Sequence, residues 1–317
     1  MEVWVWILII IGALLLFGIL PLFVMGLILY RKLLVRTSKN IWNRGMSMPS
    51  DPEYKLLFED GQRWRDEYLD FMQEVHIVND KLNLYGEYFD FGSKSAVIIL
   101  PGRMETCLYS DFYAEPYANC GLNVLTIDNR AHGLSDGRYN SLGFLEHRDI
   151  IAWAKYLHDE RGIEKIVLHG VCIGCSTAVF TATSPECPEY VKAVIAEGMY
   201  VNFDATYRLH IEEQGHRYFP IGPIALGYLK LTTGADVVHD GPLKRIPQMK
   251  IPLLMLHSRE DQYSLPEKAE ELFKACGSEV KQLVWFDTGA HSRIRIHTKE
   301  NRAAFDEAIK RFLGVVL

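Results

Sequence analysis

The sequence predicts an α/β fold, a mainly parallel sheet with helices on both faces, which carries a cap insertion and follows one N-terminal transmembrane helix. Three observations lead to this prediction. From about residue 75 onward, short apolar runs alternate with helix-length segments, as in parallel sheets connected by crossover helices. This alternation stops between Met199 and Lys250, and the segment Val3–Tyr30 contains no charged residue.

The strands are predicted from the apolar runs. Val75–Val78 and Leu82–Phe89 alternate well enough to form an antiparallel hairpin. Ala96–Leu100 is a continuous apolar run, which is typical of a strand buried on both faces, and Val124–Ile127 is the next such strand. Further strands are expected at Lys165–His169, Val191–Ala196, Leu253–Leu256 and Leu283–Phe286. Helices are expected near Phe112–Cys120, around Gly143–His158, from Cys175 onward, and over Leu265–Cys276 and Lys299–Phe312.

The N-terminal apolar segment is long enough to span a bilayer. Its 28 residues would form a helix of about 42 Å, whereas the hydrocarbon core is about 30 Å thick. The start of the chain, Met-Glu, lacks the basic residues of a cleaved signal peptide. Basic residues follow the segment directly, so the positive-inside rule places the rest of the chain in the cytoplasm: Arg31, Lys32, Arg36, Lys39 and Arg44.

These features divide the chain into three parts. Residues 1–30 are the transmembrane helix, residues 31–59 a basic juxtamembrane segment and tether, and residues 60–317 the α/β domain. Asn40–Glu59 is expected to be a polar tether. A cap over the active site is expected at about residues 199–250, which are rich in aromatic and basic side chains. This segment is expected to contain helices, for instance near Phe203–Gln214. A surface excursion with its own small core is the alternative to a cap.

Composition limits the classes of partner. The chain has 317 residues, of which 49% are hydrophobic, enough for one large core plus an appendage. After residue 44 it carries 29 basic and 39 acidic residues, which argues against a nucleic-acid partner. Six cysteines in a chain of this length do not indicate a disulfide framework and are compatible with a reducing compartment.

The segment Lys165–Ala182 has the pattern of a nucleophile elbow, with Cys172 at the tip of a strand–turn–helix corner. Gly170 and Gly174 stand two positions to either side, where a strained corner needs small residues. A helix N-terminus after the corner favours a thiolate. The corner therefore predicts a cysteine nucleophile.

Two further residues complete a possible catalytic triad. Asp261 follows the strand Leu253–Leu256, and His291 follows the strand Leu283–Phe286. A thiol nucleophile needs a base, and that base needs an acid to fix its tautomer. The chain order is nucleophile, acid, histidine, and each residue comes after a predicted strand. We therefore expect Cys172, Asp261 and His291 to act together.

From about residue 75 to the C-terminus the chain resembles an α/β-hydrolase of the S33/S9-peptidase-like group. The resemblance is carried by LPGR at residues 100–103, by SREDQYSLP and GAHSR near the C-terminus, and above all by Asp-x-Arg-x-His-Gly-x-Ser at residues 128–135. In the family this last segment braces the active-site floor. The chain departs from the family in having Pro101-Gly102 in place of His-Gly, and Cys172 in place of serine.

The resemblance implies an oxyanion hole made by the backbone N–H groups of Arg103 and Ile173. Candidate substrate-binding side chains are Arg103, Met104, Tyr200 and Tyr207; Arg103 either holds a substrate carboxylate or points to solvent. A cysteine nucleophile resembles that of dienelactone hydrolases. We therefore expect a hydrolase of activated acyl compounds (thioesters, esters or lactones) that forms an acyl-thioester enzyme, with peptidase activity less favoured.

Several alternatives remain open. The enzyme is an acyltransferase if the acyl acceptor is not water, and a membrane-bound binding protein if the site has decayed. Cys172 and Cys175 also form a C-x-x-C pattern, which suggests a redox pair or a disulfide that switches the enzyme off. No cofactor is expected, because the sequence shows neither metal-ligand spacing nor a glycine-rich phosphate loop. The expected partners are a small acyl substrate, which membrane anchoring suggests is lipidic, and the membrane itself.

Overall fold

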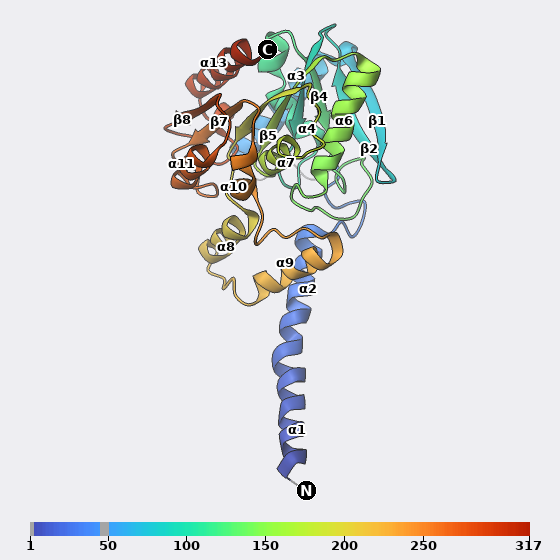
Figure 1. The fold of residues 1–317 in the computed structure, drawn as a ribbon, viewed down its shortest axis with the longest axis vertical. Coiled ribbons are helices and arrows are strands. Elements are labelled where there is room, and N and C mark those ends of the chain that lie inside the picture. Colours follow the sequence, from blue (N-terminus) through green and yellow to red (C-terminus); the bar gives the residue numbers. More distant parts are fainter. Residues whose placement is uncertain (1–2, 45–50) are drawn as a thin grey trace.

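The computed structural model describes residues 3–44 and 51–317, and the eight strands of this part form one sheet (Figure 1). Their order is β1-β2-β4-β3-β5-β6-β7-β8, with β1 and β2 antiparallel to their neighbours and the remaining pairs parallel. This confirms the mainly parallel sheet. The strands are β1 (Met72–Asn79), β2 (Leu82–Phe89), β3 (Ser95–Leu100), β4 (Asn123–Ile127), β5 (Lys165–Val171), β6 (Val191–Glu197), β7 (Leu253–Ser258) and β8 (Lys281–Phe286).

Helices cover both faces of the sheet, and each face has its own apolar cluster. One face is covered by α6 (Glu146–Arg161), α7 (Ile173–Ala182) and α11 (Pro266–Ala275). The other is covered by α3 (Pro52–Glu67), α5 (Glu115–Asn119) and α13 (Lys299–Val316). The central strands β3 and β4 are largely apolar because both of their faces are buried.

Shorter helical pieces connect these elements. The single helix expected near Phe112–Cys120 is instead three short pieces in the structure: α4 (Cys107–Ser110), η3 (Asp111–Tyr113) and α5. Pro116 in the first turn of α5 lacks an N–H, which favours a new helix start there. The remaining short elements are η2 (Leu69–Phe71), η4 (Ile246–Gln248) and α12 (Ile294–His297).

The N-terminal residues form a long helix that projects away from the sheet (Figure 1). It consists of α1 (Val3–Ala13), the π-helical turn η1 (Leu14–Ile19) and α2 (Leu20–Leu34). Pro21 removes one backbone donor from the helix, which accounts for a widened turn just before it. Among the described residues this is the one helix that is long and apolar enough to cross a membrane, and its most apolar 18 residues are not buried.

The expected polar tether over Asn40–Glu59 is wrong where the structure describes it; its residues 45–50 lie outside the described part. Trp42 is buried and stacks on His132, with ring centroids 4.7 Å apart. From Pro52 the chain forms α3, and the side chain of Asp51 caps this helix by accepting the Tyr54 N–H at 3.0 Å. Asp-Pro thus begins a helix here instead of a turn.

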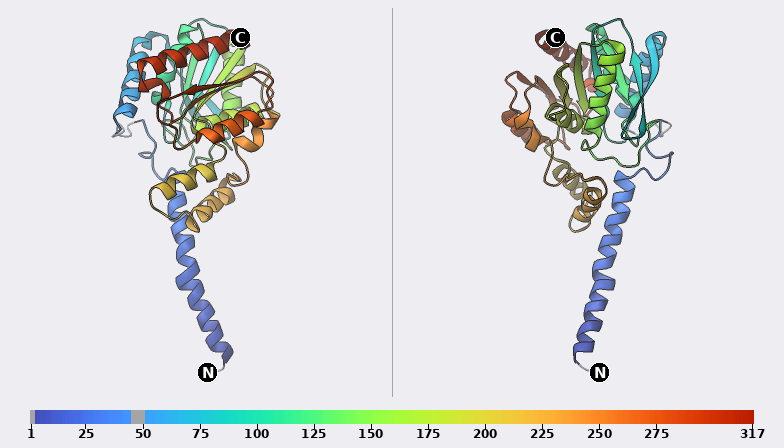
Figure 2. Two further views of the ribbon diagram at one scale, coloured as in Figure 1. Left: turned by 90° about the vertical axis from the view of Figure 1, so that its left-hand side faces the viewer. Right: turned by 45° about the vertical axis from the view of Figure 1, so that its right-hand side comes forward.

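Three α-helices, followed by the 3-10 turn η4, lie between β6 and β7: α8 (Phe203–Glu213), α9 (Ile221–Thr233) and α10 (Pro242–Arg245). The helix expected near Phe203–Gln214 is confirmed as α8, and further helices were expected in this segment, although the position of α9 was not predicted. Figure 2 shows α8 and α9 between the sheet and the N-terminal helix. A third apolar cluster joins side chains of α2, α8 and α9 with Ile173 beside the nucleophile elbow.

The Asp-x-Arg-x-His-Gly-x-Ser segment forms a tight loop after β4. The two carboxylate oxygens of Asp128 accept the N–H groups of Cys107 and Leu134, each at 2.8 Å. Gly133 has a φ of +49°, and a Cβ added there would lie 2.0 Å from Asp128 Oδ2. Glycine is therefore required at this position, and Asp128 ties the loop to the chain that follows β3.

Candidate active site

Cys172 lies at the corner between β5 and α7, in backbone that non-glycine residues rarely adopt. Its φ and ψ are +53° and −111°, and its N–H donates to the carbonyl of Glu197 at 3.0 Å. A Cβ added to Gly170 would lie 2.5 Å from the Gly174 oxygen, and one added to Gly174 would lie 2.1 Å from the Leu100 oxygen. Both glycines are thus required by close contacts, as expected for a nucleophile elbow.

His291 and Asp261 meet beside this corner. His291 Nδ1 lies 2.8 Å from Asp261 Oδ2, and because a carboxylate only accepts, Nδ1 carries the proton. Asp261 Oδ1 is fixed by the N–H groups of Tyr263 and Ser264 at 2.9 and 2.7 Å. Cys172 and His291 line the same two cavities, and Cys172 is close enough to contribute to the raised pKa of His291. The structure thus brings together the three residues selected from the sequence.

Glycine at position 198 makes room for this imidazole. Gly198 follows β6 with a φ of +67°, and a Cβ added there would lie 3.0 Å from His291 Cε1. Its carbonyl accepts the Ser264 hydroxyl at 2.8 Å, which ties the end of β6 to the loop that carries Asp261.

The charges in this group support one another. Burial alone would lower the pKa of His291, but the negative charges of Cys172 and Asp261 raise it well above its ordinary value. Burial alone would raise the pKa of Asp261, but the His291 charge and hydrogen bond lower it. The site therefore favours a protonated His291 imidazole beside the Asp261 carboxylate.

Two cavities meet at Cys172 and His291. One, of about 300 Å³, is lined on its outer side by aromatic side chains from the segment between β6 and β7, including Tyr200, Phe203 and Tyr207. The second, of about 240 Å³, extends toward the loop after β3 and toward α3. The nucleophile is thus reached through an apolar cavity and a more polar one.

Arg103, Tyr200 and Tyr207 line the first cavity as expected, but Met104 does not. Arg103 Nη1 is buried without a hydrogen-bond partner among the described residues, and burial lowers the pKa of the guanidinium. This side chain therefore does not point freely to solvent. Met104 has a φ of +69° and a side chain that is 37% exposed, so this turn directs it away from the cavities.

Two buried carboxyl groups near the site were not identified from the sequence. Glu105 Oε2 accepts the Gly102 N–H at 2.6 Å, and burial raises the pKa of Glu105 to about 7. Glu197, the last residue of β6, accepts the Ile294 N–H at 3.3 Å, and burial also raises its pKa to about 7. The one available sequence signal was that Glu197 follows directly on a continuous apolar strand.

Tyr263 also lines both cavities and was not singled out from the sequence. Its ring packs edge-on against His291, with centroids 5.5 Å apart. It follows Asp261 by two positions, and that proximity in sequence was the only available signal.

All six cysteines are free. Cys175 is fully buried in α7, where its thiol donates to the carbonyls of Gly170 and Glu197 at 3.1 and 3.2 Å. Burial raises the pKa of Cys175 well above its ordinary value. These features oppose a C-x-x-C redox role, because the second thiol of such a pair must become a thiolate.

Comparison with known proteins places the chain in a family. The family model described as "alpha/beta hydrolase fold" matches residues 95–209, and the one described as "Serine aminopeptidase, S33" matches residues 234–295. The Bacillus subtilis (strain 168) protein YqkD is 31% identical over 224 residues, which cover 69% of this chain and 71% of YqkD. The Caenorhabditis elegans alpha/beta hydrolase domain-containing protein aho-3 is 24% identical over 68% of this chain and 54% of its own length.

Solved structures share the same architecture. The Pyrococcus furiosus esterase Pf2001 superposes with a TM-score of 0.66 at 22% identity, covering 80% of this chain and 94% of the esterase. At this identity the likeness shows the fold. Together with the family models and the relationship to YqkD, it shows that the chain belongs to the α/β-hydrolase superfamily of enzymes.

Proposed function

We propose that this protein is a membrane-anchored hydrolase that cleaves activated acyl compounds (thioesters, esters or lactones) through a Cys172–His291–Asp261 triad. The observation that carries the proposal is the position of His291, which bonds Asp261 at 2.8 Å and lines the same two cavities as Cys172. This arrangement supplies a nucleophile, a base and an orienting acid in one group.

In the first half-reaction Cys172 Sγ attacks the acyl carbon, and His291 holds the thiol proton. Asp261 stabilises the imidazolium that results. The backbone N–H of Ile173 opens a helix and so has no partner inside it, which leaves it free to bind the oxyanion together with the Arg103 N–H. When the tetrahedral intermediate collapses, His291 protonates the leaving thiol or alcohol, and the acyl group remains on sulfur.

In the second half-reaction water replaces the leaving group. His291 takes a proton from the water as its oxygen attacks the carbonyl carbon of the thioester, and the C–S bond breaks when this second tetrahedral intermediate collapses. Collapse of the second intermediate releases the carboxylic acid, and the proton returns to Cys172. Because the acyl-enzyme is a thioester, acyl groups with good leaving groups suit this nucleophile better than unactivated amides.

Two features support an ester or thioester substrate. The apolar cavity beside Cys172 suits an acyl chain. The fold is also shared with the Pyrococcus furiosus esterase described above. The helices α8 and α9 would then act as the cap of this cavity.

We also propose that α1, η1 and α2 span a bilayer and that the catalytic domain is cytoplasmic. The apolar side chains of this helix are exposed along most of its length. The basic residues begin at Arg31, where the apolar segment ends. A C-terminal tag should resist external protease in intact cells, and digestion of the tag without lysis would contradict this topology.

The catalytic proposal is tested with full-length protein in detergent micelles and a panel of acyl thioesters, aryl esters and lactones. Cys172→Ala and His291→Ala should each lower kcat/KM by about 10³-fold or more. Cys187→Ala is the matched control, since Cys187 is half-buried and distant from the cavities, and it should keep full activity. Full activity of Cys172→Ala would end the proposal.

The acyl acceptor is decided in the same assay. Adding amines or alcohols during turnover should leave the free acid as the main product. Conjugates formed in preference to acid would identify a transferase with the same acyl-enzyme. Alkylation of Cys172 by iodoacetamide at mildly acidic pH should inactivate the enzyme, because only a thiolate reacts under these conditions, whereas a decayed binding site would not react.

A further inference from the structure

We infer that α9, together with Phe219, is buried in the interfacial layer of the same bilayer that α1–α2 spans, so that the cap of the active site is seated on lipid. This goes beyond the proposed activity and rests on the proposed anchoring. The partner is the lipid surface itself, and the substrate class that follows is an acyl compound that partitions into a membrane.

The first observation is that α9 packs directly on α2. A Cβ added to Gly26 would lie 2.4 Å from Ile224 Cγ2, so a larger residue on α2 would push the two helices apart. The rings of Tyr30 and Tyr228 stack with centroids 5.9 Å apart, and the Tyr30 hydroxyl lies 2.6 Å from Thr232 Oγ1. The position of α9 is therefore fixed by the long apolar helix.

The depth of α9 follows from the length of that helix. Val3–Leu34 has 32 residues and is about 48 Å long, whereas about 20 residues fill a hydrocarbon core of about 30 Å. Glu2 is charged, so the core segment cannot begin before Val3 and ends no earlier than about residue 22. The Tyr228 hydroxyl donates to the Phe23 carbonyl at 3.4 Å, which places this side of α9 at the edge of the hydrocarbon. A span that began later would place α9 deeper still.

The outer surface of α9 suits this depth. Leu231 is 83% exposed and Phe219, just before the helix, is 77% exposed, although both are large apolar side chains. The helix contains no acidic residue, and its one cation, Lys230, pairs with Asp236 at 2.6 Å. Lipid covers such a surface without leaving a charge unpaired.

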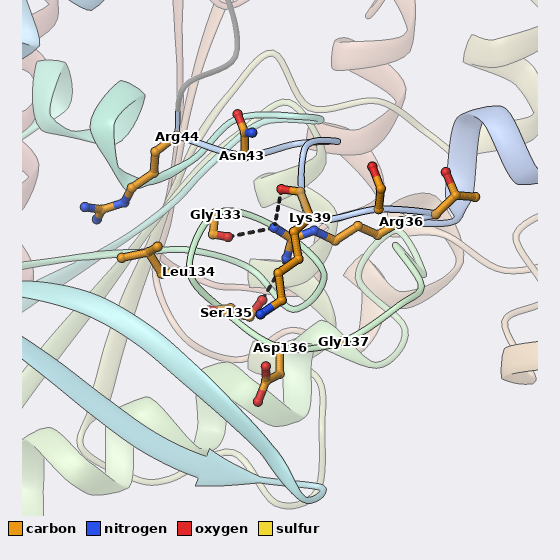
Figure 3. Close-up of a pocket in the computed structure, with 11 residues that line it drawn as sticks. Arg36, Lys39, Asn43, Arg44, Gly133, Leu134, Ser135, Asp136 and Gly137 are labelled. Carbon is orange, nitrogen blue, oxygen red and sulfur yellow. Dashed lines mark hydrogen bonds between the residues drawn. The ribbon is translucent and has the colours of Figure 1, made fainter.

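Positive charge lies beside the end of α2, at the level expected for headgroups. Figure 3 shows a pocket of about 530 Å³ next to Arg36 and Lys39. The Arg36 guanidinium donates to the carbonyls of Gly133 and Ser135, and Asp128 and Asp136 act on its charge from nearby without an ion pair. Lys39 has no carboxylate partner among the described residues and lines the same pocket. Cations at this level favour an anionic membrane surface.

The cap is connected to the catalytic cavity through α8. Tyr218 lies just before α9, and its hydroxyl donates to Asp204 on α8. Phe203 and Tyr207, also on α8, line the cavity at Cys172. Seating α9 on lipid therefore places the aromatic wall of the cavity next to the bilayer surface. A substrate with its acyl chain in the membrane has a short path to the nucleophile.

The direct test uses the unaltered full-length protein in vesicles of phosphatidylcholine and phosphatidylglycerol, with a fraction of the phosphatidylcholine carrying a diazirine on its acyl chain. After illumination, lipid adducts should appear on peptides from Val3–Tyr30 and on peptides from 219–233. Peptides from 299–317 should carry none, because the C-terminus lies at the opposite end of the molecule (Figure 1). Adducts on the first segment but none on the second would overturn the inference while leaving the anchor intact. Absence of adducts on Val3–Tyr30 would overturn the anchoring and the inference with it.

A functional test follows with Leu231→Asp and Phe219→Asp. Val315→Asp is the matched control, because Val315 is 65% exposed near the C-terminus. For a long-chain acyl thioester embedded in the vesicles, the two cap variants should raise KM by about tenfold, and the control should not. Hydrolysis of a short water-soluble thioester, which also reports correct folding, should be unchanged in all three. An unchanged KM for the embedded substrate, or an equal loss for both substrates, would contradict a lipid-seated cap.

Discussion

Glu197 provides the most quantitative test of the electrostatics of this site. Its side chain is fully buried at the end of β6, where Oε1 accepts the Ile294 N–H and Oε2 has no hydrogen-bond partner among the described residues. Burial raises the pKa of Glu197 from 4.5 to about 7. The folded protein therefore disfavours the ionised carboxylate that the unfolded chain carries at neutral pH.

The magnitude and its sign follow from linkage. Below pH 4.5 the carboxyl is protonated in both states and carries no electrostatic cost. Between pH 4.5 and about 7 the unfolded chain ionises first, so the free energy of unfolding falls as the pH rises, and above about pH 7 the full cost is present. At 1.36 kcal/mol per pKa unit this amounts to about 3 kcal/mol.

Replacing Glu197 by glutamine should remove this loss, because the amide keeps an acceptor for Ile294 and never ionises. Relative to the unaltered protein, Glu197→Gln should be equally stable at pH 4.5 and about 3 kcal/mol more stable at pH 8. This corresponds to a rise in Tm of about 6 °C or more. Glu164→Gln, at an exposed position, is the matched control and should change little at any pH.

The assay is thermal and urea unfolding of the full-length protein in detergent micelles, followed by tryptophan fluorescence from pH 4.5 to pH 8. A stability difference that does not change with pH would show that Glu197 is not held neutral by burial. A variant that is less stable throughout this range would refute the reasoning entirely.

Three further outcomes follow from the same contacts. Cys172→Ser should lower the pKa of His291, because the negative charge of Cys172 helps to raise it; NMR titration of the imidazole measures this, and an unchanged pKa would show that the two groups do not interact. Gly174→Ala should destabilise the protein by about 3 kcal/mol or prevent folding, since its Cβ would overlap a carbonyl of β3, whereas Gly314→Ala, in open space on α13, should cost nothing; equal melting temperatures would contradict the close contact at the elbow. After peroxide treatment, reductant should restore activity equally well in Cys175→Ala and in the unaltered protein. Recovery in the unaltered protein but not in the variant would support a regulatory disulfide between Cys172 and Cys175.

Much of the fold was predictable because buried parallel strands are continuous apolar runs. Val124–Ile127 was predicted and β4 spans Asn123–Ile127, and comparable agreement holds for the other strands. The chain order of Cys172, Asp261 and His291 was also readable, since each follows a strand and parallel strands bring their carboxyl ends to one edge.

Helices that depend on tertiary packing were missed. In α9, Gly222, Pro223 and Gly227 argue against a helix, yet Pro223 falls in the first turn, where its missing N–H costs little. Packing against α2 then stabilises the remainder, as the contact between Gly26 and Ile224 shows. That contact joins residues far apart in the sequence, so no local sequence pattern predicts it.

The side-chain environment of the site also could not be predicted from the sequence. Glu105 sits three residues after Gly102 in a loop where a solvated carboxylate would be expected, but it folds back to accept the Gly102 N–H and becomes buried. Met104 appeared equivalent to Arg103 from the sequence, and only the left-handed backbone at Met104 separates their directions.

The central claim is that the sulfur of Cys172 carries the acyl group during turnover. The most direct measurement is acid-quenching of the full-length enzyme during hydrolysis of a short acyl thioester, followed by intact-mass and peptide mass spectrometry. The account predicts an adduct of one acyl group on the peptide that contains Cys172, and none on Cys172→Ala. Hydrolysis without any adduct under conditions that trap slow deacylation, or an adduct on another residue such as Ser176, would contradict it.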